Sequence, residues 1–187
     1  MQQKLSDWLA GKGKGARAGS FSEVVKFGEA VVLAVKGGVA DSVLELAGGE
    51  NLARKIVIDA TNPIADEPPE NGVLRFFTDL NESLMEKLQK ARREVRFVKA
   101  FSCVGNALRV NPSFPGGRLT MFIAGNDEKA KNEVTSILTQ FGWETEDMGG
   151  AEGALGGAEG ARAIEPLCML WCIPGLRKNE WSPPSSS

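Results

Sequence analysis

Few side chains in this chain could carry out chemistry, because the sequence contains neither histidine nor tyrosine. A Ser–His–Asp triad, a His-ligated metal and a Tyr–Lys proton relay are therefore excluded. The remaining candidates are Asp59, which ends an apolar run, and the thiols of Cys103, Cys168 and Cys172. We assign none of them a catalytic or metal-ligating role, and we expect a bound cofactor to supply any difficult chemistry.

Each of these residues also has a structural interpretation. Asp59 could meet a ligand at the end of a strand or simply cap a turn. Cys168 and Cys172 are four residues apart and could share one face of a helix, where thiols usually fill a core. Cys103 is either a reactive thiol or a small apolar residue. The large aromatic residues interpreted as core or interface side chains are Trp143 and Trp171.

Four short apolar runs predict the strands that must position these residues: Ala30–Val35, Lys55–Ala60, Val95–Phe101 and Leu119–Ala124. Three are almost continuously apolar, as in strands buried on both faces of a parallel sheet, whereas Val95–Phe101 alternates and is expected nearer an edge. Strands that alternate with helices predict an α/β fold. Helix signals lie between and after the strands, at Ser20–Glu23, Asp41–Ala47, Ser83–Glu86, Asp127–Phe141 and Glu165–Ile173.

The carboxyl ends of parallel strands meet at one edge of a sheet, and α/β proteins bind ligands in the crevice outside that edge. We therefore expect any pocket to be lined by the residues that follow the predicted strands. These include Lys36, Asn62, Pro63 and Val104–Asn106.

Several motifs occur in a specific order along the chain: Asp59-Ala60-Thr61-Asn62-Pro63, Val98-Lys99-Ala100-Phe101 with Val104-Gly105-Asn106, Phe122-Ile123-Ala124-Gly125-Asn126-Asp127, and Glu165-Pro166-Leu167. With this order and spacing, from about Leu5 to Trp181, the chain resembles the deazaflavin (coenzyme F(420))-dependent NADP oxidoreductases. It is most similar to their broad bacterial branch of NADPH-dependent reductases. The resemblance implies a Rossmann-type doubly wound parallel sheet that binds NADP.

The resemblance also implies which residues approach the cofactor. Val35 and Lys36 follow the first apolar run, Thr61-Asn62-Pro63 would line the nicotinamide pocket, and Ser102 with Val104, Gly105 and Asn106 would form the opposite wall. Lys36 stands where the family usually has proline, and Ser102-Cys103 replaces its usual Asn-Thr pair.

The family opens with a strand, a G-x-G-x-x-G loop, a helix and a second strand, and we expect this first strand–helix–strand unit to be lacking here. The glycine cluster Gly11–Gly15 follows a helical segment and precedes an extended stretch, Ala16–Phe21, which is the wrong context for that loop. NADPH binding should then be weak. The Ala30–Val35 strand should have an open edge that leads to aggregation or a homodimer, unless the Ala16–Phe21 strand covers it.

Length and composition set further expectations. One NADP-binding domain should span residues 1–176, followed by a disordered tail at 177–187. The net charge of −2 and an odd number of cysteines, three, favour a cytoplasmic protein without a nucleic-acid or membrane partner. A duplicated segment, Gly149–Leu155 and Gly156–Arg162, is identical in six of seven positions and is interpreted as a longer loop or helix start rather than a phosphate cradle.

Two functions remain open at this stage. One is an NADP(H)-dependent oxidoreductase that transfers a hydride between NADP(H) and a small-molecule acceptor, such as a deazaflavin, a flavin or a metal chelate. The other is a non-catalytic Rossmann remnant that acts at most as an interaction module.

Overall fold

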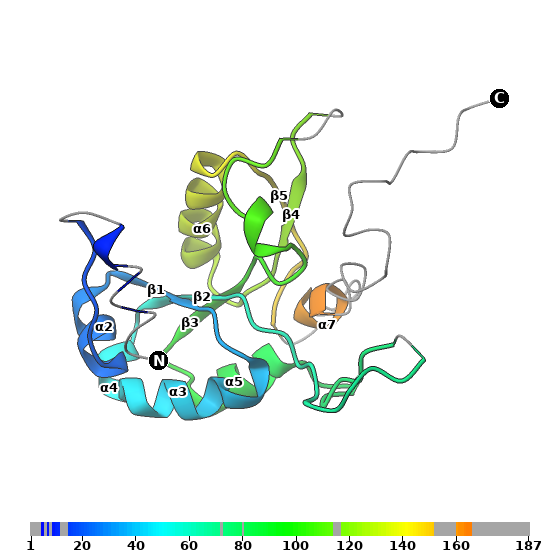
Figure 1. The fold of residues 1–187 in the computed structure, drawn as a ribbon, viewed down its shortest axis with the longest axis horizontal. Helices are drawn as coiled ribbons and strands as arrows, with labels where there is room; N and C mark the ends of the chain where they lie inside the picture. Colours follow the sequence, from blue (N-terminus) through cyan, green and yellow to red (C-terminus); the bar gives the residue numbers. More distant parts are fainter. Residues whose placement is uncertain are drawn as a thin grey trace.

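The computed structural model describes residues 5, 7, 9–11, 15–71, 73–79, 81–113, 117–151 and 160–165. Its central element is a three-stranded parallel sheet in the order β1-β2-β3, formed by Ala30–Leu33, Ile56–Asp59 and Arg96–Lys99 (Figure 1). In register, Val57 of β2 lies between Val31 and Phe97. The predicted strands are therefore present, each shortened to four residues.

A second parallel pair, β4 (Thr120–Ile123) with β5 (Glu144–Asp147), continues from the third strand. It joins β3 through a single antiparallel bridge, in which Lys99 N donates to Ala124 O at 2.8 Å and Ala124 N donates to Lys99 O at 3.3 Å. The sequence analysis missed β5, because this mostly exposed polar strand has no apolar run.

Four helices, α2, α3, α5 and α6, begin within one residue of where the sequence predicts, whereas α4 and α7 were not predicted. Ser20 and Ser83 each form a capping box with the glutamate three residues later, which satisfies free N–H groups of the first turn. Asp127 caps the longest helix. The bounds are α2 (Phe21–Phe27), α3 (Ala40–Ala47), α4 (Gly49–Leu52), α5 (Leu84–Ala91), α6 (Glu128–Gln140) and α7 (Gly160–Ile164), with 3-10 turns η2 (Gly37–Val39) and η3 (Asn106–Leu108).

Alternation along β2 and β3 divides the core into two layers. Val57 and Phe97 pack with residues of α2, α3 and α5 on one face. Ile58 and Val98 pack with α6 residues on the other. Figure 1 shows α3 and α5 on one side of the sheet and α6 on the other. A mixed α/β fold with parallel strands covered on both faces is Rossmann-like, as predicted.

Three expectations about the elements need correction. Residues 16–20 form no strand, because the Ser20 capping box directs the chain into α2 at Phe21. The strand within Val95–Phe101, β3, is the last of the three-stranded sheet but is not an exposed edge. Phe97, Val98 and Lys99 are fully buried, because α6 and β4 pack against β3. The chain is already helical at Gly160–Ile164 (α7), ahead of the helix start predicted at Glu165, and residues 166–173 of the predicted helix lie outside the described residues.

Other predicted features fall outside the described residues. They are residues 12–14 of the glycine cluster, residues 152–159 of the duplicated segment, Cys168, Trp171, Cys172 and the tail at 177–187.

The open edge predicted for the first strand is present in the described part of the chain. β1 pairs only with β2, and the Val32 side chain is 58% exposed. Burial on both faces, which its apolar sequence predicted, is therefore achieved by β2 but not by β1. The adjoining surface of α2 is also apolar, since Phe21, Val24 and Phe27 are exposed.

None of the helices in the described ranges combines the length and apolar character that crossing a bilayer requires.

Hydrogen exchange should distinguish the two edges of β1. Leu33 O accepts from Ala60 N, so Leu33 faces β2 and the neighbouring Val32 directs its N–H away from the ladder. We expect the Val32 amide to exchange quickly and the amide of Val57, in the central strand, to exchange at the slow rate of the core. Slow exchange at Val32 in a monomer would mean that another segment covers this edge.

The substitution Val32→Lys tests whether this edge causes association. A lysine on an exposed edge strand should change the free energy of unfolding by no more than about 0.5 kcal/mol and should lower self-association measured by sedimentation. Val57→Lys is the matched control and should unfold the protein, because Val57 is fully buried. Unfolding by Val32→Lys would show that β1 is covered.

Candidate functional site

The loops that follow β1 and β2 enclose a cavity of about 320 Å³ at the carboxyl ends of these strands. This is the edge at which the sequence analysis expected a pocket. The lining residues are Val35, Lys36, Gly37, Ala60, Asn62, Ile64, Ala65 and Asp66.

Gly37 allows the two loops to meet. A Cβ atom at this position would lie 2.1 Å from the carbonyl oxygen of Asn62 and 2.9 Å from Cδ2 of Leu84, closer than any side chain can approach. Only glycine therefore lets the backbone after β1 rest directly against the Asn62 turn. The sequence analysis did not single out this residue.

The loop after β3 lies next to the Asn62 turn without lining the cavity. Asn62 Nδ2 donates a hydrogen bond of 2.8 Å to the carbonyl oxygen of Ser102, which is buried. Phe101, just before it, has a φ of 63°, which is unusual for a bulky residue and turns the chain sharply after the strand.

The structure brings together some of the predicted site residues and not others. Val35, Lys36 and Asn62 line the cavity, and Ser102 contacts it through Asn62. Thr61 and Pro63 are buried within the turn. The remaining residues continue the β3 loop without lining the cavity: Val104, Gly105 and Asn106. That these residues bind a cofactor stays a prediction.

Beneath the turn lies a fully buried lysine. Lys99 Nζ donates to Asp59 Oδ2 at 3.0 Å, to Glu165 Oε1 at 3.1 Å and to the carbonyl oxygen of Thr61 at 2.7 Å. The other Asp59 oxygen, Oδ1, accepts from Thr61 N at 2.9 Å and from Thr61 Oγ1 at 2.6 Å. Asp59 therefore caps the turn, and no exposed surface remains on it for a ligand.

Burial alone would lower the pKa of Lys99, but the charges of Asp59 and Glu165 outweigh it and raise the pKa above its ordinary value. Lys99 is thus a cation with all three N–H groups satisfied. From the sequence, Lys99 was named only as part of the Val98–Phe101 motif, without a role of its own. A lysine within an apolar run indicates that a partner is needed, but only the structure shows that Asp59 lies opposite it in the register.

The N-terminus of α5 holds this network in place. Glu165 accepts from the backbone N–H groups of Leu84 and Met85, where the helix dipole favours a carboxylate. Arg162 binds both oxygens of Glu86, at 2.8 and 2.6 Å. Arg162 is also the one position at which the two copies of the duplicated segment differ, with Leu155 in the first copy. The second copy therefore includes an anchor for α7.

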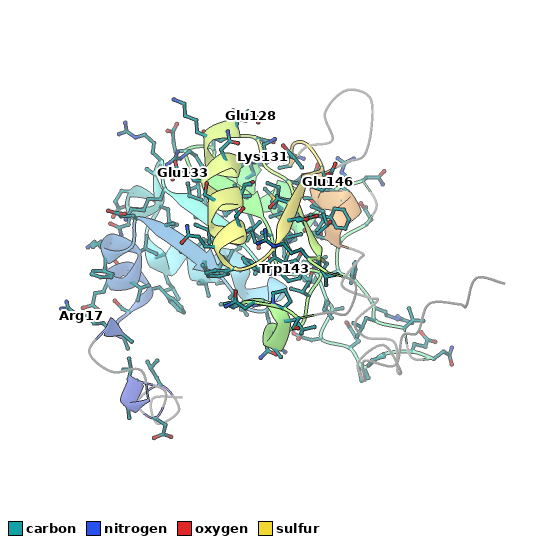
Figure 2. All side chains as sticks on the ribbon, turned by 90° about the horizontal axis from the view of Figure 1, so that it is seen from above. Arg17, Glu128, Lys131, Glu133, Trp143 and Glu146 are labelled. Carbon is teal, nitrogen blue, oxygen red and sulfur yellow. The ribbon has the colours of Figure 1, made fainter. Side chains whose placement is uncertain are left out.

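Two residues with open interpretations are now placed. Burial raises the pKa of the Cys103 thiol, which favours the small apolar role over a reactive thiolate. Trp143 is 1% exposed and donates from Nε1 to the carbonyl oxygen of Arg109 at 2.9 Å, as a core aromatic does (Figure 2).

A larger hollow of about 530 Å³ lies at the opposite end of β3, around Arg93, Arg96 and Asp127. Two of its charged lining residues, Lys90 and Arg93, are exposed, and Lys90 pairs with Glu82. We favour the smaller cavity as the functional site because it lies at the carboxyl ends of the parallel strands.

Residues 1–63, which include β1, β2 and the Asn62 turn, match the family described as NADP oxidoreductase, coenzyme F(420)-dependent. A crystal structure from Arthrobacter sp. FB24, provisionally assigned as an F(420)-dependent NADP-reductase, is 32% identical to this chain with a TM-score of 0.71. The chain belongs to this oxidoreductase family.

The alignment with the Arthrobacter protein covers 81% of the present chain and 66% of the Arthrobacter chain. A hypothetical protein from Sinorhizobium meliloti is 19% identical, with a TM-score of 0.56 and coverage of 76% of this chain and 68% of its own, and it supports the fold alone. A comparison with curated proteins found no match.

The close approach at Gly37 predicts a large difference between two adjacent glycines. Gly37→Ala should lower the free energy of unfolding by about 1–3 kcal/mol, because the new Cβ collides with backbone atoms of the Asn62 turn. Gly38→Ala meets nothing within 4 Å and should leave stability unchanged or raise it by about 0.4–1 kcal/mol. Urea denaturation measures both. Equal effects would show that the two loops are not in contact.

The Arg162–Glu86 pair predicts how stability depends on acid. Burial would raise the pKa of Glu86, but hydrogen bonds from Arg162 and Ser83 lower it below the ordinary value of 4.5. The stabilisation is therefore complete above about pH 4.5 and is lost as the pH falls through the lower folded-state pKa. In urea denaturation at a series of pH values, Glu86→Gln should lose less stability on acidification than the unmodified protein. Parallel curves would contradict the ion pair.

Proposed function

We propose that the chain binds NADP(H) with the nicotinamide in the cavity at the carboxyl ends of β1 and β2, and that it transfers a hydride between NADP(H) and a small-molecule acceptor. A deazaflavin or flavin is the acceptor that family membership favours. The observation that supports the site best is the meeting of the Lys36–Gly37 loop and the Asn62 turn around one cavity, with the Asn62 side chain held by the Ser102 carbonyl.

The residues present suit a nicotinamide. A volume of about 320 Å³ is at the lower end of the range for ligand pockets, and it suits one end of a dinucleotide. Asn62 Oδ1 and Ser102 Oγ are buried without a hydrogen-bond partner in the described part of the chain. A carboxamide carries both a donor and an acceptor, so one bound beside the Asn62 side chain would supply the donor that Asn62 Oδ1 lacks.

Lys36 is suited to a negatively charged part of the ligand. Its Nζ lies 3.0 Å from Asp66 Oδ1, and both side chains are more than four-fifths exposed, at 81% and 84%. Such an exposed ion pair contributes only about 0–1 kcal/mol, so Lys36 can exchange Asp66 for a phosphate or carboxylate at little cost.

When bound, NADPH supplies a hydride, which carries two electrons and one proton. The chain's part is to hold the ring against the Asn62 turn and to exclude water from one side through the apolar residues Val35, Ala60 and Ile64. An acceptor of the flavin type takes the hydride directly and its second proton from water. This agrees with a chain that has neither histidine nor tyrosine.

The proposal is tested by titrating the protein with NADPH up to millimolar concentrations of the nucleotide and measuring the nicotinamide fluorescence. We expect saturable binding that Asn62→Ala weakens by about tenfold, since one hydrogen-bonding side chain is lost. Asn132→Ala, on the exposed surface of α6, is the matched control and should have no effect. Loss of NADPH absorbance on addition of a flavin or deazaflavin then tests hydride transfer.

Absence of binding throughout this range would reject the proposal. The non-catalytic alternative, an interaction module, would then be favoured by the open edge of β1.

A further inference from the structure

Lys99 makes one contact that its charge does not require. Two carboxylates, Asp59 and Glu165, already surround the buried ammonium group. The third N–H points to the carbonyl oxygen of Thr61, the residue immediately before Asn62, at 2.7 Å.

Every polar atom of Thr61 therefore makes a hydrogen bond. Its N–H and its hydroxyl both donate to Asp59 Oδ1, and its carbonyl accepts from Lys99. Asp59 and Lys99 are themselves paired across β2 and β3, so both residues that hold Thr61 belong to the sheet. The turn at Thr61 cannot rotate without breaking a buried hydrogen bond.

Asn62 inherits this orientation. Asn62 lines the cavity, its side chain donates to Ser102, and its carbonyl oxygen lies 2.1 Å from where a Cβ of Gly37 would be. A rotation at Thr61 would therefore move the wall of the cavity on two sides.

Lys131 shows what a buried lysine with a purely structural role looks like in this protein. Its Nζ lies 2.6 Å from Asp147 and 2.7 Å from Glu128, which is its neighbour on α6 in Figure 2. Both of these carboxylate partners lie outside the cavity loops. Both lysines thus have two carboxylate partners, and only Lys99 binds a carbonyl of the site.

We infer that Lys99 is a positioning residue of the cavity, which fixes the Thr61–Asn62 turn in the geometry that receives the ligand. Glu165, which directly follows α7, completes the position of Lys99, so the binding of its carboxylate to the start of α5 also sets the turn. The effect on NADP(H) rests on the proposed function, whereas the effect on the turn does not.

The test compares Lys99→Met with Lys131→Met. In ligand-free protein, Lys99→Met should speed hydrogen exchange of the Thr61 amide and shift the NMR resonances of the Asn62 side-chain amide. It should also weaken NADPH binding by about tenfold or more for the folded fraction. Lys131→Met should lower stability but leave the Thr61 amide, the Asn62 resonances and NADPH affinity unchanged.

A second variant guards against unfolding. The Lys99, Asp59 and Glu165 charges sum to −1, and Lys99→Met combined with Glu165→Gln keeps this sum at −1 through Asp59 alone. The double variant should show the same loosening of Thr61 in a protein with less unbalanced charge.

The outcomes separate the two ideas. Unchanged exchange at Thr61 and unchanged Asn62 resonances would overturn the inference whatever happens to NADPH. A loosened turn with full NADPH affinity would overturn the positioning role in binding. If the unmodified protein does not bind NADPH while Lys99→Met loosens the turn, the inference about the turn stands and the proposed function is rejected.

Discussion

The arrangement of this protein depends on one cation placed where water cannot reach it. A lone buried ammonium group would cost several kcal/mol, so Lys99 requires the carboxylates of Asp59 and Glu165 within hydrogen-bonding distance. Asp59 comes from the neighbouring strand. Glu165 also accepts hydrogen bonds from the free N–H groups at the start of α5. The end of β2, the end of β3, the start of α5 and the segment after α7 are thereby held together. Removing one partner typically costs about 3–5 kcal/mol, because the remaining charge stays buried.

The cavity is a consequence of this anchoring and of the sheet geometry. Three parallel strands end at one edge, and their following loops can only leave the sheet there. The buried network holds the loop after β2 from below, and the contact with Gly37 holds it from the side. In the loop after β3, the carbonyl oxygen of Ser102 accepts a hydrogen bond from the Asn62 side-chain amide. A pocket built on constrained backbone in this manner is largely formed before a ligand arrives.

Much of the fold was predictable from local signals, and the site was predictable only in outline. Apolar runs and Ser–Glu capping boxes depend on residues within one element, and they located β1 to β4, α2 and α5 correctly. The polar strand β5 has no such signal, since pairing with β4 alone makes it a strand. The strand predicted at residues 16–20 is absent, because the helix cap at Ser20 directs this stretch into α2 instead. Asn62 and Lys36 could be placed by their position after strands. The role of Lys99 could not, because its partners lie 40 and 66 residues away in the chain.

These long separations have a consequence for the order in which the molecule assembles. Contacts between distant residues form slowly, because the intervening chain must first lose its freedom. As synthesis proceeds from the N-terminus, β1, β2 and β3 can pack before residue 165 has left the ribosome. During that interval Lys99 and Asp59 have no Glu165, and the start of α5 lacks its carboxylate. The turn beside the cavity therefore reaches its final shape among the last events of folding, and slow steps in refolding should be sought there.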